Sequence, residues 1–126
     1  MNSQVIDITG KAADKFISSF YNSYDSKRNL VSSYYAEQSI MLWNGNPFSG
    51  SQQINTFILS FPTTEHVILS YDAQPIPQLK DDMDFMLTVY GTVAYGKSKP
   101  KKFSEVFVLT KHNSQYLIGS DTFRFV

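Results

Sequence analysis

Hydrophobic residues recur with helical spacing in the first half of the chain and with alternating spacing in the second half. Residues 9–24 carry them at i, i+3, i+4 and i+7, the pattern of one apolar helix face. A second, short helix is predicted around residues 30–34, and a third from near Ser51 to Phe61, where Pro62 ends it. The aromatic residues of these stripes that we expect in the core are Phe16, Phe20, Tyr24, Phe57 and Phe61.

Alternating patterns predict four strands in the second half, at residues 66–74, 84–95, 103–110 and 115–125. The connectors between the last three strands are short, which is typical of antiparallel hairpins. Helices first and strands later indicate an α+β fold with an antiparallel sheet. Because no repeat, linker or low-complexity tract interrupts the chain, we expect a single domain over residues 1–126.

A tight hairpin is predicted at Leu42-Trp43-Asn44-Gly45-Asn46-Pro47-Phe48-Ser49-Gly50, ahead of the third helix. Asn-Gly between apolar runs favours a type I′ turn, in which both central residues need positive φ. This segment holds the only tryptophan of the chain. We therefore expect strand, turn and short strand here, followed by a helix starting near Ser51.

Both faces of the predicted sheet are largely apolar, although a sheet with one solvated face normally alternates apolar and polar residues. The helices can cover one face, so the other would remain as an exposed apolar patch, which is typical of an interaction site. Strong curling of the sheet is the alternative. The residues we predict on the partner-binding face are Met86, Thr88, Tyr90, Tyr116, Ile118, Thr122 and Arg124.

The composition of the chain argues against several classes of function. Formal net charge is zero, with 11 basic and 11 acidic residues, so nucleic-acid binding is not expected as the main task. Cysteine is absent, which excludes a disulfide framework, thiol catalysis and a cysteine-based zinc site. The N-terminal sequence shows no signal peptide, and no apolar run is long enough to span a bilayer, so we expect an intracellular protein without membrane contact and without a cofactor.

Two segments resemble the nuclear transport factor 2-related export proteins, the light chains of the general messenger-RNA export receptor. They are Leu42-Trp43-Asn44-Gly45-Asn46 with Ser49-Gly50, and the terminal Ser120-Asp121-Thr122-Phe123-Arg124-Phe125. Weaker agreement runs through residues 27–30 and 62–65. The resemblance implies a nuclear transport factor 2-like cone, in which three N-terminal helices pack in a strongly bent antiparallel sheet.

The resemblance also implies a non-catalytic subunit. In that family the light chain packs sheet to sheet on the related domain of the large receptor subunit. It stabilises the receptor, which binds nucleoporin Phe-Gly repeats, carries mRNA and shuttles between nucleus and cytoplasm through the pore. The arginine of the Phe-Arg-Phe motif, here Arg124, pairs with an acidic partner residue. Physically, an interface guanidinium needs a carboxylate, and a homodimer would oppose two arginines, so Arg124 favours a heterodimer.

Three other functional interpretations remain open. A homodimeric import carrier for the GDP-bound Ran GTPase needs an acidic rim, for which Asp81, Asp82 and Asp84 are the candidates. A dehydratase or isomerase needs an acid or base in a pocket, and His66 and His112 are both predicted at the surface. A basic hairpin offers auxiliary contacts to RNA phosphates, although such loops more often keep a sheet edge soluble. Its lysines are Lys97, Lys99, Lys101 and Lys102.

Overall fold

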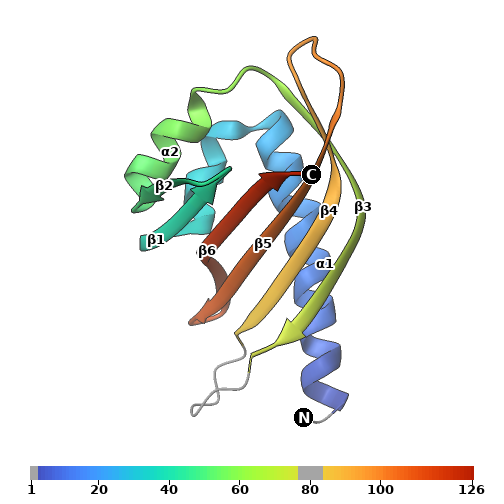
Figure 1. Cartoon of the computed structure of the whole chain (residues 1–126). Helices are drawn as coiled ribbons and strands as arrows, with labels where there is room; N and C mark the ends of the chain where they lie inside the picture. The colour runs from blue at the N-terminus through green and yellow to red at the C-terminus, as the bar shows by residue number, and fades with distance from the viewer. Residues whose placement is uncertain (1–2, 77–83) are drawn as a thin grey trace.

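The computed structural model describes residues 3–76 and 84–126, which form three helices and one six-stranded sheet (Figure 1). The helices are α1 (Ser3–Ser26), the 3-10 helix η1 (Arg28–Tyr34) and α2 (Ser51–Leu59). The strands are β1 (Tyr35–Trp43), β2 (Asn46–Ser49), β3 (Thr64–Pro75), β4 (Phe85–Tyr95), β5 (Lys101–His112) and β6 (Gln115–Phe125). None of the helices in these two ranges is long and apolar enough to cross a membrane.

The strand order in the sheet is β2-β1-β6-β5-β4-β3. Neighbouring strands are antiparallel, as predicted, except that β1 and β6 run parallel. This pairing places the hairpin segment beside the C-terminal strand, with Trp43 opposite Phe123. The two segments that carry the family resemblance are therefore direct neighbours in the sheet.

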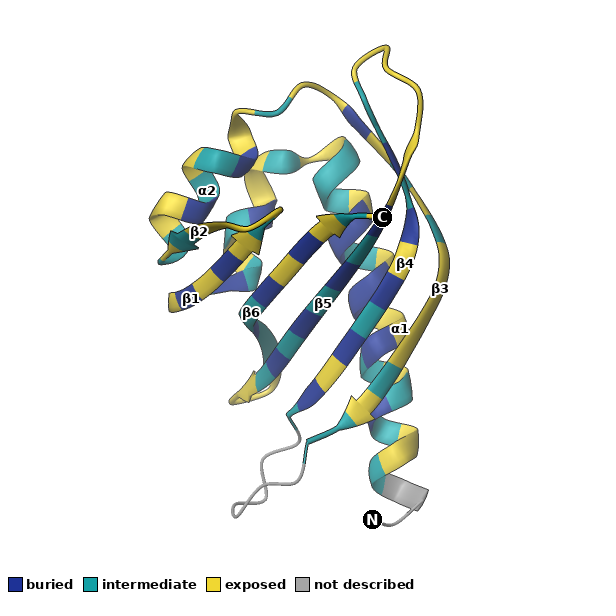
Figure 2. Cartoon of the chain, in the orientation of Figure 1, coloured by how far each residue is buried: buried dark blue, intermediate teal, exposed yellow. Residues whose placement is uncertain are grey.

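The helix α1 crosses one face of the sheet and buries its apolar stripe there (Figures 1 and 2). Phe20 lies at the centre, fully buried, with its ring 5.0 Å from Phe16 and 5.3 Å from Phe107. Burying large aromatic side chains in edge-to-face and stacked contacts is a major stabilising contribution. Of the aromatic residues predicted for the core, Phe16 and Phe20 are buried and Tyr24 and Phe57 pack against the core. Phe61 is half-buried outside it, against the rings of Trp43, Phe57 and Tyr95.

Arg28 joins three segments behind the sheet. Its Nε donates to the carbonyl of Tyr24 at 3.1 Å, and its Nη1 donates to the carbonyl of Phe61 at 2.7 Å. Its Nη2 donates to Oγ1 of Thr64 at 3.0 Å, where β3 begins. The guanidinium therefore satisfies backbone carbonyls at two chain turns, which fixes the passage from α1 to η1 and from α2 to β3.

The close approach of the paired strands β3 and β4 depends on Gly91. A β-carbon added there would lie 2.3 Å from the carbonyl oxygen of Val67, far inside normal contact distance. We expect Gly91→Ala to destabilise the fold by about 1–3 kcal/mol, because the strand backbone must shift. Gly119→Ala is the matched control, since its β-carbon would meet neighbours at an ordinary 3.4 Å. Thermal unfolding measures both, and equal melting temperatures would contradict the prediction.

Candidate partner interface

The face of the sheet turned away from α1 is open to solvent, and we call it the outer face. Burial alternates along β4 and β5, so that every second residue points into the core and the others point outward. Figure 2 shows this alternation as bands along the strands. The outward residues of the four central strands are Ile40, Leu42, Met86, Thr88, Tyr90, Thr92, Lys102, Ser104, Val106, Val108, Ser120, Thr122 and Arg124.

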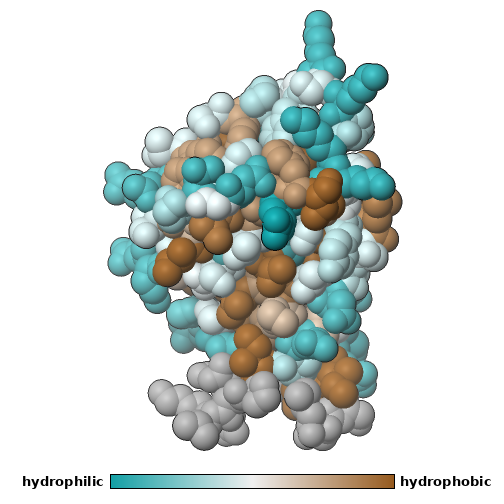
Figure 3. Space-filling model, in the orientation of Figure 1, coloured by the Kyte–Doolittle hydropathy of each residue, from teal (hydrophilic) through white to brown (hydrophobic). Residues whose placement is uncertain are grey.

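The middle of the outer face is apolar. Ile40 (54 % exposed) and Leu42 are exposed on β1, Tyr90 (49 % exposed) and Met86 are exposed on β4, and half-buried Val106 and Val108 of β5 lie between these two strands. Figure 3 shows hydrophobic side chains gathered over the strands on this side of the molecule. The registers align these residues across the strands, since Met86 lies opposite Val108. A contiguous exposed apolar surface with polar margins is typical of a protein-binding site.

Arg124 stands at one end of this apolar surface. It lies opposite Ser104 in the β5–β6 pair, and its guanidinium makes no hydrogen bond or ion pair with any residue in the described ranges. Beside it is a shallow depression of about 380 Å³. The depression is lined by Leu42, Asn44, Gly45, Thr122, Phe123, Arg124 and Phe125. The outer face thus offers an unpaired cation next to exposed apolar side chains.

The prediction that Tyr116 and Ile118 share the outer face with Thr122 and Arg124 is wrong. Ile118 is fully buried, and the ring of Tyr116 packs 5.0 Å from the core ring of Phe85. The cause is a β-bulge in β6, where the register moves from Leu109 opposite Ile118 to Val108 opposite Ser120. The extra residue, Gly119, reverses the inward and outward alternation along the strand. The predicted positions Met86, Thr88, Tyr90, Thr122 and Arg124 do lie on the outer face.

The hairpin is built as predicted. Asn44 and Gly45 have φ angles of 47° and 85°, the left-handed conformations that a type I′ turn requires. The amide of Asn44 donates to the carbonyl of Phe123 at 2.8 Å, and its side-chain Oδ1 accepts from the amide of Phe125 at 3.0 Å. The Asn46 side chain donates to the Trp43 carbonyl at 3.1 Å. These bonds tie the turn to the strand that carries Arg124.

Trp43 is a packing residue. Its ring stacks on Phe123 at 5.5 Å with an interplanar angle of 3°, and it also contacts Phe57 and Phe125. Gly50, at φ 86°, turns the chain from β2 into α2, and a β-carbon there would come 3.3 Å from the carbonyl oxygen of Glu37. The tryptophan and the C-terminal aromatics therefore hold the inner side of the sheet beneath Arg124.

The four lysines of the β4–β5 hairpin do not form one patch. Lys97 and Lys99 lie in the exposed connector between the strands. The ammonium of Lys101 lies 5.2 Å from the ring centroid of Phe125, a cation–π contact on the inner side. Lys102 follows it with the opposite orientation and lies opposite Thr92 on the outer face. The structure thus gives these lysines three different surroundings.

A buried acidic cluster lies under the sheet, and its member Glu105 was not predicted from the sequence. The hydroxyl of Tyr21 donates to Glu105 Oε1 at 2.7 Å, and the hydroxyl of Tyr35 donates to Asp121 Oδ2 at 2.8 Å. Burial, and then repulsion from Asp121, raises the pKa of Glu105 well above its usual value. Burial also raises the pKa of Asp121. The signal in the sequence was that Glu105 shares the alternation of Phe103 and Phe107.

His66 is not a surface residue, contrary to the prediction. Its side chain is 4 % exposed, its ring lies 5.1 Å from that of Tyr21, and its Nδ1 lies 2.6 Å from Asp25 Oδ1. Burial opposes ionisation of Asp25, but hydrogen bonds with His66 outweigh it and lower the pKa of that carboxyl. His112 is exposed, as predicted, with Nε2 3.0 Å from Thr110 Oγ1.

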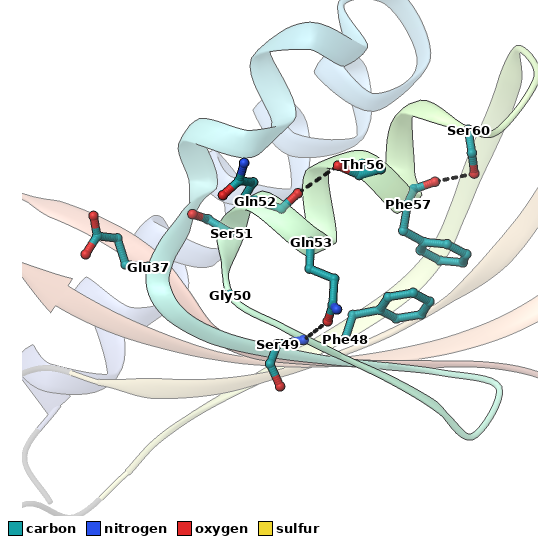
Figure 4. Close-up of a pocket in the computed structure, with 10 residues that line it drawn as sticks. All are labelled: Glu37, Phe48, Ser49, Gly50, Ser51, Gln52, Gln53, Thr56, Phe57 and Ser60. Carbon is teal, nitrogen blue, oxygen red and sulfur yellow. Dashed lines mark hydrogen bonds between the residues drawn. The ribbon is translucent and has the colours of Figure 1, made fainter.

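Two further cavities lie away from these titratable groups. One of about 860 Å³ lies between β2 and the start of α2, where the rings of Phe48 and Phe57 stack at 4.1 Å (Figure 4). Gln53 Oε1 accepts there from the amide of Ser49, and Glu37 is its one ionisable side chain. The other, about 530 Å³, lies between α1 and the β5–β6 hairpin. The residues that line it are Ala12, Lys15, Phe16, Ser19, Ser33, Tyr34, Ser114, Gln115, Tyr116 and Leu117.

None of the three cavities found in the described ranges combines an apolar hole with several carboxylates, the arrangement that an import carrier for Ran would need. Asp81 and Asp82 lie outside the described residues. Neither Glu105 nor His66 lines any of these three cavities.

Known proteins are similar to this chain in sequence. The sequence profile described as "Nuclear transport factor 2 (NTF2) domain" matches residues 12–125. The chain is 34 % identical over 115 residues to the NTF2-related export protein of Caenorhabditis elegans, covering 89 % of this chain and 84 % of that protein. It is also 33 % identical over 116 residues to nuclear transport factor 2 of Dictyostelium discoideum, covering 89 % and 88 %.

Solved structures agree on the fold. Nuclear transport factor 2 from Cryptosporidium parvum superposes with a TM-score of 0.83 at 26 % identity, covering 94 % of each chain. A chain of the complex between Mtr2 and the Mex67 M domain from C. albicans gives 0.79 at 17 % identity, covering 93 % and 94 %. A putative scytalone dehydratase from Novosphingobium aromaticivorans gives 0.83 at 10 % identity, covering 99 % and 89 %. The predicted cone-shaped α+β fold is confirmed.

Proposed function

Since this chain belongs to the nuclear transport factor 2 domain family, we propose that it is the small, non-catalytic subunit of a heterodimeric mRNA export receptor. The outer face packs against the sheet of a related domain in the large subunit and stabilises it. The observation that carries the proposal is the outer face itself, where an unpaired Arg124 borders exposed apolar side chains. The relatives named as export proteins support this assignment.

A partner domain explains why these side chains are exposed. Burying Ile40, Leu42, Met86 and Tyr90 removes apolar surface from water, at roughly 25 cal/mol per Å² of area covered. Arg124 would then be desolvated, which requires a carboxylate on the partner. A second copy of this chain would place arginine rather than acid at one end of the joined faces. The heterodimer is therefore favoured over the homodimer.

In the assembled receptor, contact with nucleoporin Phe-Gly repeats and with mRNA belongs to the complex as a whole. The large subunit supplies the Phe-Gly site, and any RNA contact by Lys97 or Lys99 is auxiliary. The receptor shuttles between nucleus and cytoplasm through the pore. Neither membrane binding nor a cofactor has a part in this function.

The import-carrier and enzyme alternatives have less support. Relatives named nuclear transport factor 2 match this chain, but the described cavities lack a carboxylate rim. The dehydratase likeness, at 10 % identity, concerns the fold alone. The acidic cluster of Glu105 and Asp121 is buried, and neither residue lines any of the three cavities described above.

Light scattering of the chain alone, and co-expressed with the transport-factor-like domain of the export receptor from the same organism, tests the proposal. We expect a stable 1:1 complex that elutes as a single species. A tight homodimer that ignores this domain and binds GDP-loaded Ran would support the import carrier instead. Turnover of a small carbonyl substrate would support an enzyme.

A further inference from the structure

Lys102 is separated from the other hairpin lysines by the direction of its side chain. Burial along β5 begins with exposed Lys101 and Lys102 and then alternates from buried Phe103, so Lys102 points outward with Ser104 and Val106. It lies opposite Thr92 on β4, and its carbonyl accepts from the amide of Val126 at 3.1 Å. Lys102 is therefore part of the outer face and not of the exposed connector.

Arg124 and Lys102 are neighbours on this face. Arg124 lies opposite Ser104, which is two residues from Lys102 on the same side of β5. Such diagonal positions on adjacent strands are roughly 7–8 Å apart, within reach of long side chains. In the described ranges, no carboxylate lies within 4 Å of either cation. The outward acid at this end of the sheet, Glu65, is opposite Ala94 and is separated from Lys102 by β4.

We propose that Arg124 and Lys102 form a two-cation site that selects a partner with two carboxylates at the matching positions. This proposal rests on the proposed function, since it concerns the same partner face. Two like charges on adjacent strands repel each other in the free chain, and a pair of acids would relieve that repulsion on binding. A partner with only one carboxylate would pair with Arg124 but would bury Lys102 without a counter-charge. The second cation therefore adds specificity for a partner with two carboxylates.

Lys102 also opposes the association of two copies of this chain. Two copies of the outer face would bring together two arginines and two lysines without a carboxylate in the adjacent outward positions Thr92 and Ser104. Like charges brought together at an interface oppose association, which adds to the effect of Arg124 alone. An RNA contact by Lys102 is the competing explanation. It is less favoured because Lys102 lies on the outer face, opposite Thr92 and diagonal to Tyr90, and not at the connector tip.

Lys102→Glu, measured against Lys99→Glu, tests the proposal. The two variants make the same charge change in the same hairpin, but Lys99 lies in the exposed connector. With the purified transport-factor-like domain as partner, we expect Lys102→Glu to weaken binding about tenfold and Lys99→Glu less than twofold. Lys102→Gln should have an intermediate effect, and it replaces the glutamate variant if that variant does not fold. The effect of Lys102→Glu should shrink as salt is added.

Each remaining outcome has a definite meaning. Equal affinities for Lys102→Glu and Lys99→Glu, while Arg124→Asp still disrupts the complex, overturn the two-cation site and leave the proposed function standing. No effect from any of the three variants, Arg124→Asp included, removes the proposed function as well. If Lys102→Glu keeps full affinity for the domain but lowers binding of the wild-type complex to an oligouridine probe, Lys102 is an RNA contact and the proposal is wrong.

Discussion

Arg124→Asp is expected to abolish stable association with the large subunit's transport-factor-like domain while leaving the fold intact. The Arg124 side chain is exposed and makes no hydrogen bond or ion pair within the described parts of the chain, so its replacement removes no such internal bond. In the complex the new carboxylate would face the partner's acid. Breaking one side of a buried ion pair costs about 3–5 kcal/mol, which corresponds to a loss of affinity of more than a hundredfold.

Co-purification and titration calorimetry measure this effect, and circular dichroism checks the fold. Lys11→Asp is the matched control, because it also places an aspartate where an exposed cation stood, but on α1, across the sheet from the outer face. We expect the control to bind like the wild type. Undiminished affinity of Arg124→Asp would show that the arginine does not contact the partner, and the outer face would lose its main support as the interface.

Much of the fold could be predicted from periodicity. The hairpin was predictable because Asn44 and Gly45 are residues that tolerate positive φ, and both adopt it. The strands β4 and β5 were predictable because their apolar residues alternate and one set is buried. Predictions of this kind depend on local sequence alone.

Long-range pairing and irregular register could not be predicted in this way. The alternation in β6 is reversed by the bulge at Gly119, and a single sequence does not show where an extra residue enters a strand. Consequently Ile118 was assigned to the wrong face. The parallel pairing of Trp43 with Phe123 joins segments that are far apart in the sequence, and His66 became buried because α1 supplies Asp25 beside it.

The site was predictable to the same degree. Arg124, Thr122 and the outward residues of β4 follow from alternation and from the resemblance. The separation of Lys102 from Lys101 does not, because four lysines within six residues look alike until the strand assigns them to different sides. The residues that we propose to bind the partner are thus distinguished by strand register more than by composition.

Wild-type protein is expected to lose more stability than Glu105→Gln as the pH rises above about 4.5, the ordinary pKa of a glutamate. Burial raises the pKa of Glu105 in the folded state, so the folded chain keeps a proton that the unfolded chain releases. The stabilisation is complete below the unfolded pKa and is lost progressively up to the folded pKa. One such proton changes the free energy of unfolding by about 1.4 kcal/mol per pH unit across that range.

We assign the proton to Glu105 because repulsion from Asp121 adds to the burial that raises its pKa, whereas hydrogen bonds with Glu105 and Tyr35 moderate the raised pKa of Asp121. The amide side chain of Glu105→Gln would keep an oxygen that can accept the Tyr21 hydroxyl but cannot ionise. Urea unfolding of both proteins at several pH values measures the difference, with the exposed Glu37→Gln as control. Parallel stability curves for wild type and Glu105→Gln would mean that Glu105 carries no extra proton in the folded chain, and the buried pair would then have to be neutralised in another way.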